Sequence, residues 1–360
     1  MFVQPVRSPR DLDGFLSVVP AHAPLQRRRL DPQSEPFWRH AERELFVLKE
    51  GRRVVGRIAG VSNHAYSKLH ADGAGFFAWL ECPDDLHGAR ALLEATARWL
   101  RDRGHRLMRG PLHIGLGEEL GLMTAGFDRP ASPLCPVNPP HVPVLLGRLG
   151  LRTIAERHGY SWTREEVPPP PASLRTPAQG RSPDHEVAYR PIDALRLEKE
   201  VDRFLPTYNA DFSRRFGFVA MSRDEAQARV RDIMRFLDLR LIWLAEVGDQ
   251  PAGVVLAVPE IAPSTPRQAG PLSALRAIRS ALARKRVDRV HVLAVAVEPR
   301  FGGREIAAQL LLRAWRASLD LGVTQAELSA VDPEDEGFHQ LLFRLGVKRN
   351  RKWSVVETAI

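Results

Sequence analysis

The chain has 360 residues, 44% of them hydrophobic and 26% charged, with a formal net charge of +9. A single core stops growing near about 250 to 300 residues, so this length predicts two domains. No stretch approaches the roughly 20 consecutive apolar residues of a membrane helix, and residues 1–10 carry charges and prolines where a secretion signal would be apolar. These features argue against a membrane partner and predict a cytoplasmic protein.

The N-terminal half begins its regular structure with a predicted strand hairpin. Residues 45–48 and 53–59 alternate as strands do, and Glu50 and Gly51 mark the turn between them. The aromatic-rich residues 75–81 (GFFAWLE) predict another strand. A helix is predicted over residues 84–103, because its apolar side chains recur on one stripe.

A proline-rich segment separates the two halves. Val167 is followed by four consecutive prolines, and two more stand at Pro177 and Pro183. Consecutive prolines favour a stiff, extended segment that cannot enter a sheet interior. The sequence therefore predicts domains at residues 1–166 and 187–360, joined by a linker at 167–186.

The C-terminal half repeats the order of the first. A hairpin is predicted over residues 241–258, and the apolar run VHVLAVAV at 290–297 is typical of a central strand buried on both faces. A helix over about 306–319, a strand at 325–331, a helix at 335–345 and a last strand at 352–358 follow. The predicted fold class is α/β, with two tandem domains that each have a mixed sheet flanked by helices.

Several segments resemble one family. The core stretch VAVEPRFGGREIAAQLL, at residues 295–311, resembles the GNAT acyltransferase superfamily, in which a central strand runs into a glycine-containing loop at a helix N-terminus. More narrowly, the chain resembles a bacterial family of tandem-GNAT proteins. The resemblance lies in the segments FWRHAERELFVLKEGRRVVGRIAG, GFFAWLEC, RGPL, GLMTAGFDRP, VNPPHVPVLL, TYNADFSRRFGFVAMSRDE and ELSAVDP. The N-terminal half shows no glycine-rich phosphate loop, which predicts a degenerate copy, and the C-terminal half is predicted to hold the donor.

The resemblance implies a donor site at the end of the central strand. Backbone N–H groups near Val295 and Val297 are expected to hold the carbonyl oxygen of a thioester. Amides at the start of the next helix are expected to face the pyrophosphate of coenzyme A. The residues implied there are Arg300, Gly302, Gly303, Arg304 and Ala307.

Glu305 departs from the superfamily loop. In either register of the motif it stands where a small residue is expected. A carboxylate about 4 Å from a phosphate costs about 4 kcal/mol at an effective dielectric near 20, which weakens binding by roughly three decades. The alternative is that Glu305 turns outward and that Arg300 or Arg304 supplies the positive charge.

Aminolysis of a thioester needs a base for the amine and an acid for the leaving thiol. The resemblance implies Glu327 as the base, with Ser329 two residues on and on the same face. His291 opens the central strand and titrates near neutral pH, so it is a second candidate. The superfamily's tyrosine acid has no counterpart here, and His339 is the predicted substitute. Each of these residues also has a purely structural interpretation, as a hydrogen-bonded or ion-paired core group.

Two further segments are implicated by the resemblance. The TYNADF segment is expected to line the acceptor pocket through Tyr208, Asn209 and Phe212, or else to form a loop cap on the sheet. The element NPPH at residues 138–141 matches an Asn-Pro-Pro turn, which is rigid whatever its function. No metal site is predicted, because the cysteines and histidines lack metal-ligand spacing.

The resemblance implies an N-acyltransferase that moves an acyl group from a carrier thioester to an amine. No tightly bound cofactor is expected, and the donor is acyl-CoA or an acyl group on the phosphopantetheine of an acyl carrier protein. Two alternatives stay open: a transferase that uses aminoacyl-tRNA, and an inert protein that binds a ligand in this fold.

The basic balance of the chain suits an anionic partner, either an acidic carrier protein or a tRNA. Only 6 of the 52 basic residues are lysine, a skew that codon usage alone can also produce. The best docking candidate is the segment 267–289, which carries Arg267, Arg276, Arg279, Arg284, Lys285, Arg286 and Arg289.

Overall fold

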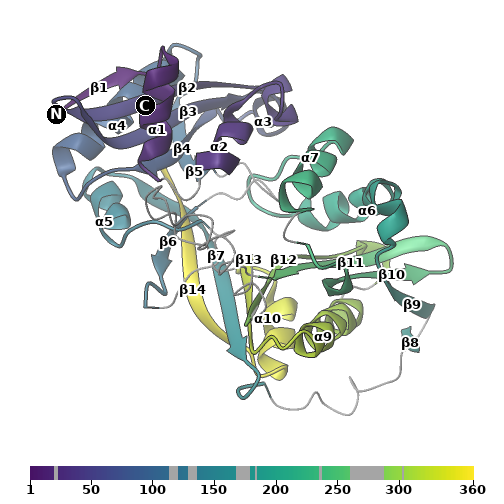
Figure 1. The fold of residues 1–360 in the computed structure, drawn as a ribbon. Coiled ribbons are helices and arrows are strands. Elements are labelled where there is room, and N and C mark those ends of the chain that lie inside the picture. Colours follow the sequence, from purple (N-terminus) through teal and green to yellow (C-terminus); the bar gives the residue numbers. More distant parts are fainter. Residues whose placement is uncertain are drawn as a thin grey trace, which may run out of the picture. The chain divides into compact units, whose positions relative to one another are not determined.

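We analysed a computed structural model of the chain, in which residues 1–19, 23–112, 121–128, 136–167, 179–182, 185–234, 237–259, 288–301 and 304–360 are described. These residues form two compact units (Figure 1). Unit 1 comprises residues 1–157, 216–219 and 351–360, and unit 2 comprises residues 158–215 and 220–350. The predicted linker falls mostly on residues outside the described ranges.

Unit 1 is built on a mixed sheet. Its strand order is β1-β2-β3-β4-β5-β14, with β6 paired to β14. Neighbouring strands are antiparallel except β4 and β5, which are parallel. The strands are β1 (Phe2–Pro5), β2 (Ala41–Glu50), β3 (Arg53–Asn63), β4 (Ala74–Glu81), β5 (Leu107–Leu112), β6 (Leu122–Ala125) and β14 (Lys348–Ala359).

Helices cover the sheet of unit 1, and strand alternation explains how. Successive side chains of a strand point to opposite faces. Phe46 and Leu48 of β2 accordingly join the buried cluster around α4, whereas Leu45 and Val47 join the cluster around α1. The helices are α1 (Pro9–Ser17), α2 (Ala23–Leu30), α3 (His64–His70), α4 (Leu86–Arg101) and α5 (His141–Arg148).

The strands of unit 2 lie in the order β7-β13-β12-β11-β10-β9-β8. Here β12 and β13 are parallel, and the other neighbours are antiparallel. The strands are β7 (Arg152–Thr163), β8 (Gln179–Ser182), β9 (His185–Pro191), β10 (Ile242–Val247), β11 (Gln250–Pro259), β12 (Arg289–Val297) and β13 (Gln325–Val331). The helices are α6 (Leu197–Phe212), α7 (Arg223–Ile233), α9 (Arg304–Asp320) and α10 (Glu336–Arg344).

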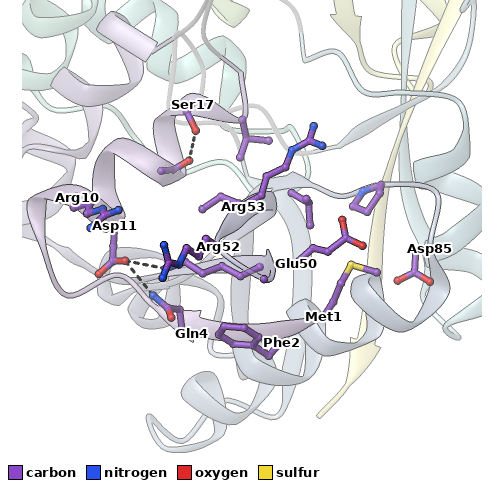
Figure 2. Close-up of a pocket in the computed structure, with 17 residues that line it drawn as sticks. Met1, Phe2, Gln4, Arg10, Asp11, Ser17, Glu50, Arg52, Arg53 and Asp85 are labelled. Atoms are coloured by element: carbon purple, nitrogen blue, oxygen red, sulfur yellow. Dashed lines mark hydrogen bonds and ion pairs between the residues drawn. The ribbon is translucent and has the colours of Figure 1, made fainter.

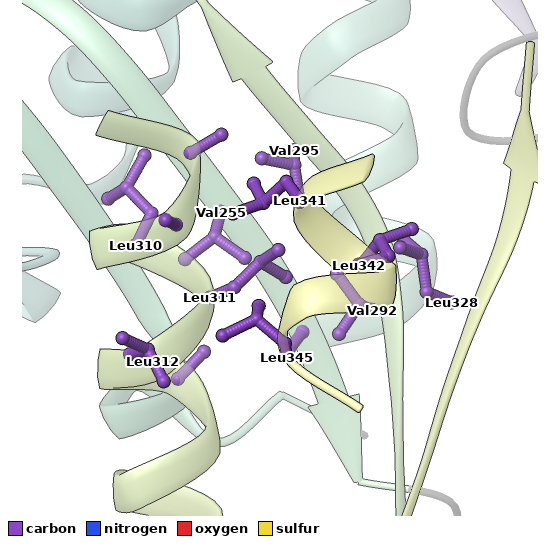
Figure 3. Packing of buried hydrophobic residues seen from close by; sticks show 14 of the residues in the cluster. Val255, Val292, Val295, Leu310, Leu311, Leu312, Leu328, Leu341, Leu342 and Leu345 are labelled. Carbon is purple, nitrogen blue, oxygen red and sulfur yellow. The ribbon is translucent and has the colours of Figure 1, made fainter. Parts of the chain in front are cut away.

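The core of unit 2 lies between the sheet and helices α9 and α10. Figure 3 shows Leu341 of α10 next to Val295 and Leu342 of α10 next to Val292 of β12, with Leu311 of α9 in the same cluster. Helix α6 packs against β11 and β12. Strand β12 has a bulge at Leu293, so that residues before and after the bulge both pack against α9 and α10. Ala257 pairs with Val292 and Leu256 with Ala294, so one residue of β12 is skipped.

Most predicted local elements are confirmed. The two hairpins are β2–β3 and β10–β11, and Gly51 and Gly248 at their turns both have φ of 58°, a conformation that favours glycine. The predicted strand at 325–331 matches β13. The last strand is predicted as part of the C-terminal domain. In the structure, Val356 of β14 pairs with Gly110 of β5 in unit 1.

The boundary between the compact units therefore differs from the boundary between the two halves of the chain. The difference lies in strands β7 and β14. The second part of β7, from His158, belongs to unit 2 and pairs with β13, whereas residues 351–360 belong to unit 1. Val355 of β14 is 0% exposed in the α1-side cluster of unit 1. The predicted boundaries at 166 and 187 stay a prediction.

The placement of β14 gives a stability test. Val355→Ala removes two buried methyl groups, which costs about 2 kcal/mol once the cavity is included. We expect hydrogen exchange to accelerate in β5 and α1 and to stay unchanged in α9 and α10. Val255→Ala in β11, also 0% exposed, should produce the reverse pattern. Faster exchange confined to α9 and α10 in the Val355 variant would contradict the assignment of β14 to unit 1.

Candidate functional site

The candidate site lies where two parallel strands of unit 2 separate. Strands β12 and β13 pair from Arg289 with Gln325 to Val292 with Leu328. Beyond Val292, β12 continues to Val297 without β13, while β13 reaches Val331, which pairs with His158 of β7. A cavity of about 810 Å³ opens at this separation, lined by Leu293, Ala294, Val295 and Val297 of β12 and by Leu328 and Val331 of β13.

Backbone amides of β12 are directed to the cavity side. Glu298 donates its N–H to the carbonyl of Ala252 at 2.9 Å. In an antiparallel ladder the residues alternate between bonding and non-bonding positions, and Gly253 pairs with Val297. The N–H groups of Val295 and Val297 therefore point away from β11, toward the edge that β13 has left. The binding of a carbonyl oxygen by these amides stays a prediction.

The helix after β12 contributes one predicted residue to the cavity wall. Ala307 of α9 lines the cavity and is 4% exposed. Arg300 stacks on the Phe301 ring at 4.8 Å and lies 3.8 Å from Glu298. Gly302 and Gly303 lie outside the described residues, as does the side chain of Arg304. Glu305 is exposed and is not part of the cavity wall, which agrees with the outward orientation.

Asp211 is a functional candidate that the sequence did not reveal. It stands in the last turn of α6 and lines the cavity with Arg214 and Arg215. Its carboxylate accepts a hydrogen bond from the backbone N–H of Val297. Burial raises the pKa of Asp211 to about 6, although Arg215 and the Val297 amide act to lower it. The only local signal was an acidic residue four positions before an arginine, at the end of a predicted acceptor segment.

The predicted acceptor residues of the same segment have other contacts. Tyr208 stacks on Phe212 with ring centroids 4.1 Å apart, and Phe212 is buried beneath the Arg215 guanidinium at 3.4 Å. The amide of Asn209 bonds both the carbonyl and the N–H of Met221, at 2.9 and 3.0 Å. None of the three predicted residues is part of the cavity wall.

Glu327 and His291 lie side by side at the paired end of the two strands. They are register partners across β12 and β13, and each is 1% exposed. Neither lines the cavity, which begins beyond this pair. The side chain of Ser329 lies outside the described residues. The structure thus brings Glu327 and His291 together but keeps both in the packed part of the sheet.

His339 has both ring nitrogens engaged away from the cavity. Its Nδ1 contacts the hydroxyl of Tyr160, and its Nε2 lies 2.9 Å from the carbonyl oxygen of Asp332. It lines a separate cavity of about 500 Å³ in unit 2, together with His158 and Arg349. The predicted acid is therefore not part of the wall of the larger cavity, which its neighbour Phe338 lines.

In the N-terminal unit, within the described residues, strand β4 is paired with β5 as far as Ala78 with Leu112. Unit 1 has an open cavity of about 1270 Å³ near its first strand (Figure 2). Asp11 there lies 3.3 Å from the Nζ of Lys49, and Arg10, Arg52 and Arg53 line the same cavity.

Within the described ranges no group of three or more His, Cys, Asp or Glu side chains is placed to hold a metal ion. No helix in those ranges is long and apolar enough to cross a membrane. The proposed basic docking segment 267–289 lies outside the described residues except at its end, where Arg289 donates to Gln325 at 2.9 Å.

Comparison with known proteins supports the predicted class. No family model matches the chain. A bacterial ceramide synthase from Caulobacter vibrioides (strain NA1000 / CB15N) is 28% identical over 272 residues, which cover 72% of this chain and 70% of the synthase. Protein YghO of Escherichia coli (strain K12) is 23% identical over 342 residues, covering 93% of this chain and 87% of YghO.

Solved structures show the fold. A tandem GNAT protein from the clavulanic acid biosynthesis pathway matches with a TM-score of 0.57 at 10% identity, covering 99% of this chain and 98% of that one. A GCN5-related N-acetyltransferase from Sphaerobacter thermophilus matches with a TM-score of 0.53 at 14% identity, covering 99% and 95%. The chain has the tandem GNAT fold, so the predicted resemblance and fold class are confirmed. The fold and the sequence similarity to the Caulobacter ceramide synthase together support the predicted enzyme class, an acyltransferase.

The contacts of His339 predict a structural role for its partner Tyr160. Tyr160→Phe removes the hydroxyl that contacts His339 Nδ1, and losing such a hydrogen bond costs about 1 kcal/mol. We expect the free energy of unfolding in urea to fall by about that amount. Tyr189→Phe is the matched control, because no hydrogen bond of its hydroxyl is found among the described residues. Equal losses in the two variants would contradict this role.

Proposed function

We propose that the protein is an N-acyltransferase that moves a fatty acyl group from a carrier thioester to the amine of a long-chain amino alcohol. Acyl-CoA and acyl carrier protein are the two donors to be distinguished. The observation that carries this proposal is the opened edge of β12, where the Val295 and Val297 amides are directed to a cavity. The Asp211 carboxylate accepts the Val297 N–H, so the Val295 N–H is the donor for the carbonyl. A fixed donor in a low-dielectric wall suits a carbonyl oxygen that gains negative charge.

The walls of the cavity suit both substrates. Leu293, Val295 and Leu328 give an apolar surface next to the amides, and hydrocarbon next to the reacting carbonyl excludes water. Asp332, Glu334 and Glu336 line the same cavity, and carboxylates attract the ammonium form of an amine before it reacts. The acyl group and the amine would thus meet in one place.

The choice of acceptor comes from the sequence relative. Ceramide synthesis joins a fatty acyl group to the amine of a long-chain amino alcohol, and the Caulobacter relative carries that name. A fatty acyl donor and a long-chain amine are both amphipathic, so burying their chains contributes about 0.8 kcal/mol per methylene to binding. The proposed function therefore names a lipid amine as acceptor.

The direct test is product formation by the full-length chain. The protein would be incubated with sphinganine and with palmitoyl-CoA, palmitoyl acyl carrier protein or an aminoacyl-tRNA, each in a separate reaction. We expect mass spectrometry to find N-palmitoyl sphinganine with one or both palmitoyl donors, together with stoichiometric release of free thiol. Absence of an acylated amine with both palmitoyl donors would contradict the proposal. Transfer only from the tRNA would replace it with an aminoacyl transferase.

Removing the Val295 N–H should reduce the rate specifically. Val295→Pro eliminates a donor that the β11 ladder does not use, so the sheet loses no hydrogen bond to β11. Loss of one such donor lowers kcat by about 100- to 1000-fold. Circular dichroism and thermal unfolding would establish that the variant is folded. A folded variant with the wild-type kcat would show that this amide does not hold the carbonyl.

A further inference from the structure

Asp211 is a titratable side chain in direct contact with the strand end where the carbonyl would bind. It lines the cavity, and its carboxylate accepts the N–H of Val297. Val295 is two residues earlier on the same strand, with its N–H directed to the same side, so the two amides lie about 7 Å apart. A carbonyl held at Val295 would therefore stand beside the Asp211 carboxylate.

This spacing matches what an attacking amine requires. A nitrogen in hydrogen-bond contact with a carboxylate lies about 3 Å from its oxygen. A nitrogen poised for attack lies about 3 to 3.5 Å from the carbonyl carbon. The sum of these two distances is about the separation of the Val295 and Val297 amides. One amine nitrogen can therefore contact both the carboxylate and the carbonyl carbon.

We propose that Asp211 is the base of the acyl transfer, the group that holds the acceptor amine and takes its proton. This assignment rests on the proposed function. The amine nitrogen forms a bond to the carbonyl carbon as one of its protons passes to the Asp211 carboxylate. The carbon–sulfur bond then breaks, and the proton passes on to the departing thiolate. The products are an amide and a free thiol, and Asp211 is ionised again.

The charges around Asp211 suit this exchange. Arg215 and Arg214 face it from the turn that follows α6, and Asp335 faces it from the start of α10. Burial raises the pKa of the carboxyl to about 6, while the two arginines act in the opposite direction. The group is therefore mostly ionised at neutral pH and yet more basic than an exposed aspartate, with a usual pKa near 3.9. A base works best with a pKa close to the working pH.

The other candidates are less well placed. Glu327 and His291 are buried in the paired part of the strands and do not line the cavity. His339 uses one ring nitrogen on Tyr160 and the other on Asp332. Asp211 lines the cavity and also contacts a β12 amide. None of Glu327, His291 and His339 combines these two features.

The kinetic test is the pH profile of kcat/KM for Asp211→Asn. A base with a raised pKa must be ionised to act, so the wild-type profile should fall as the pH drops through about 6. In the variant we expect the rate at neutral pH to fall by about 100-fold or more, and this acid limb to disappear. Asp249→Asn removes an exposed carboxylate at the β10–β11 turn and should leave rate and profile unchanged.

A second variant tests the sign of the electrostatic effect. The Arg215 charge favours the ionised carboxyl, so Arg215→Gln should raise the pKa of Asp211 and move the acid limb to higher pH. An acid limb that is unmoved by Arg215→Gln, or that persists in Asp211→Asn, would overturn the assignment of Asp211.

A measurement without substrate separates this inference from the proposed function. In protein labelled with ¹⁵N-valine, the Val297 amide signal should titrate near pH 6, because its partner carboxyl gains a proton there. The titration should vanish in Asp211→Asn. A flat wild-type signal would overturn the inference about Asp211. A clear titration in a protein that acylates no amine would instead overturn the proposed function, and the role of Asp211 as base with it.

Discussion

The separation of β12 from β13 after Val292 is the constraint on which the site depends. A strand edge without a neighbour leaves N–H groups that must find other partners, because unsatisfied buried amides are costly. At Val297 that partner is the Asp211 carboxylate. At Val295 the N–H is directed to the cavity, where a substrate carbonyl would serve. One local break in the ladder therefore creates both the space and the polar groups that acyl transfer requires.

The strand edge can stay open because the rest of β12 is firmly packed. The bulge at Leu293 shifts the alternation by one residue, so Val292 before it and Val295 after it both face α9 and α10. The leucines of these helices close that face (Figure 3). Packing of this density resists displacement, which keeps the amides fixed in direction. Preorganised dipoles of this kind need no rearrangement when charge develops on a carbonyl oxygen.

The cavity wall carries both arginine and carboxylate side chains, which come from different segments. Arg214 and Arg215 come from the turn after α6, and carboxylates such as Glu334 come from the segment that leads into α10. This division suits a reaction whose acceptor is a cation until it loses a proton. The exposed position of Glu305 removes the conflict that its place in the loop suggested, since its carboxylate does not line the cavity.

The sequence alone determined the local elements and the family of folds. Alternation, apolar stripes and turn glycines such as Gly51 and Gly248 act within a few residues, so β2–β3, β10–β11 and α9 could be predicted from them. The tertiary structure decided the strand partners and the chemistry of Asp211. Strand pairing joins residues far apart in the chain, as between Val356 and Gly110, and no local pattern encodes it. The pKa of Asp211 depends on burial and on the Val297 amide, which exist only once α6 has packed on β12.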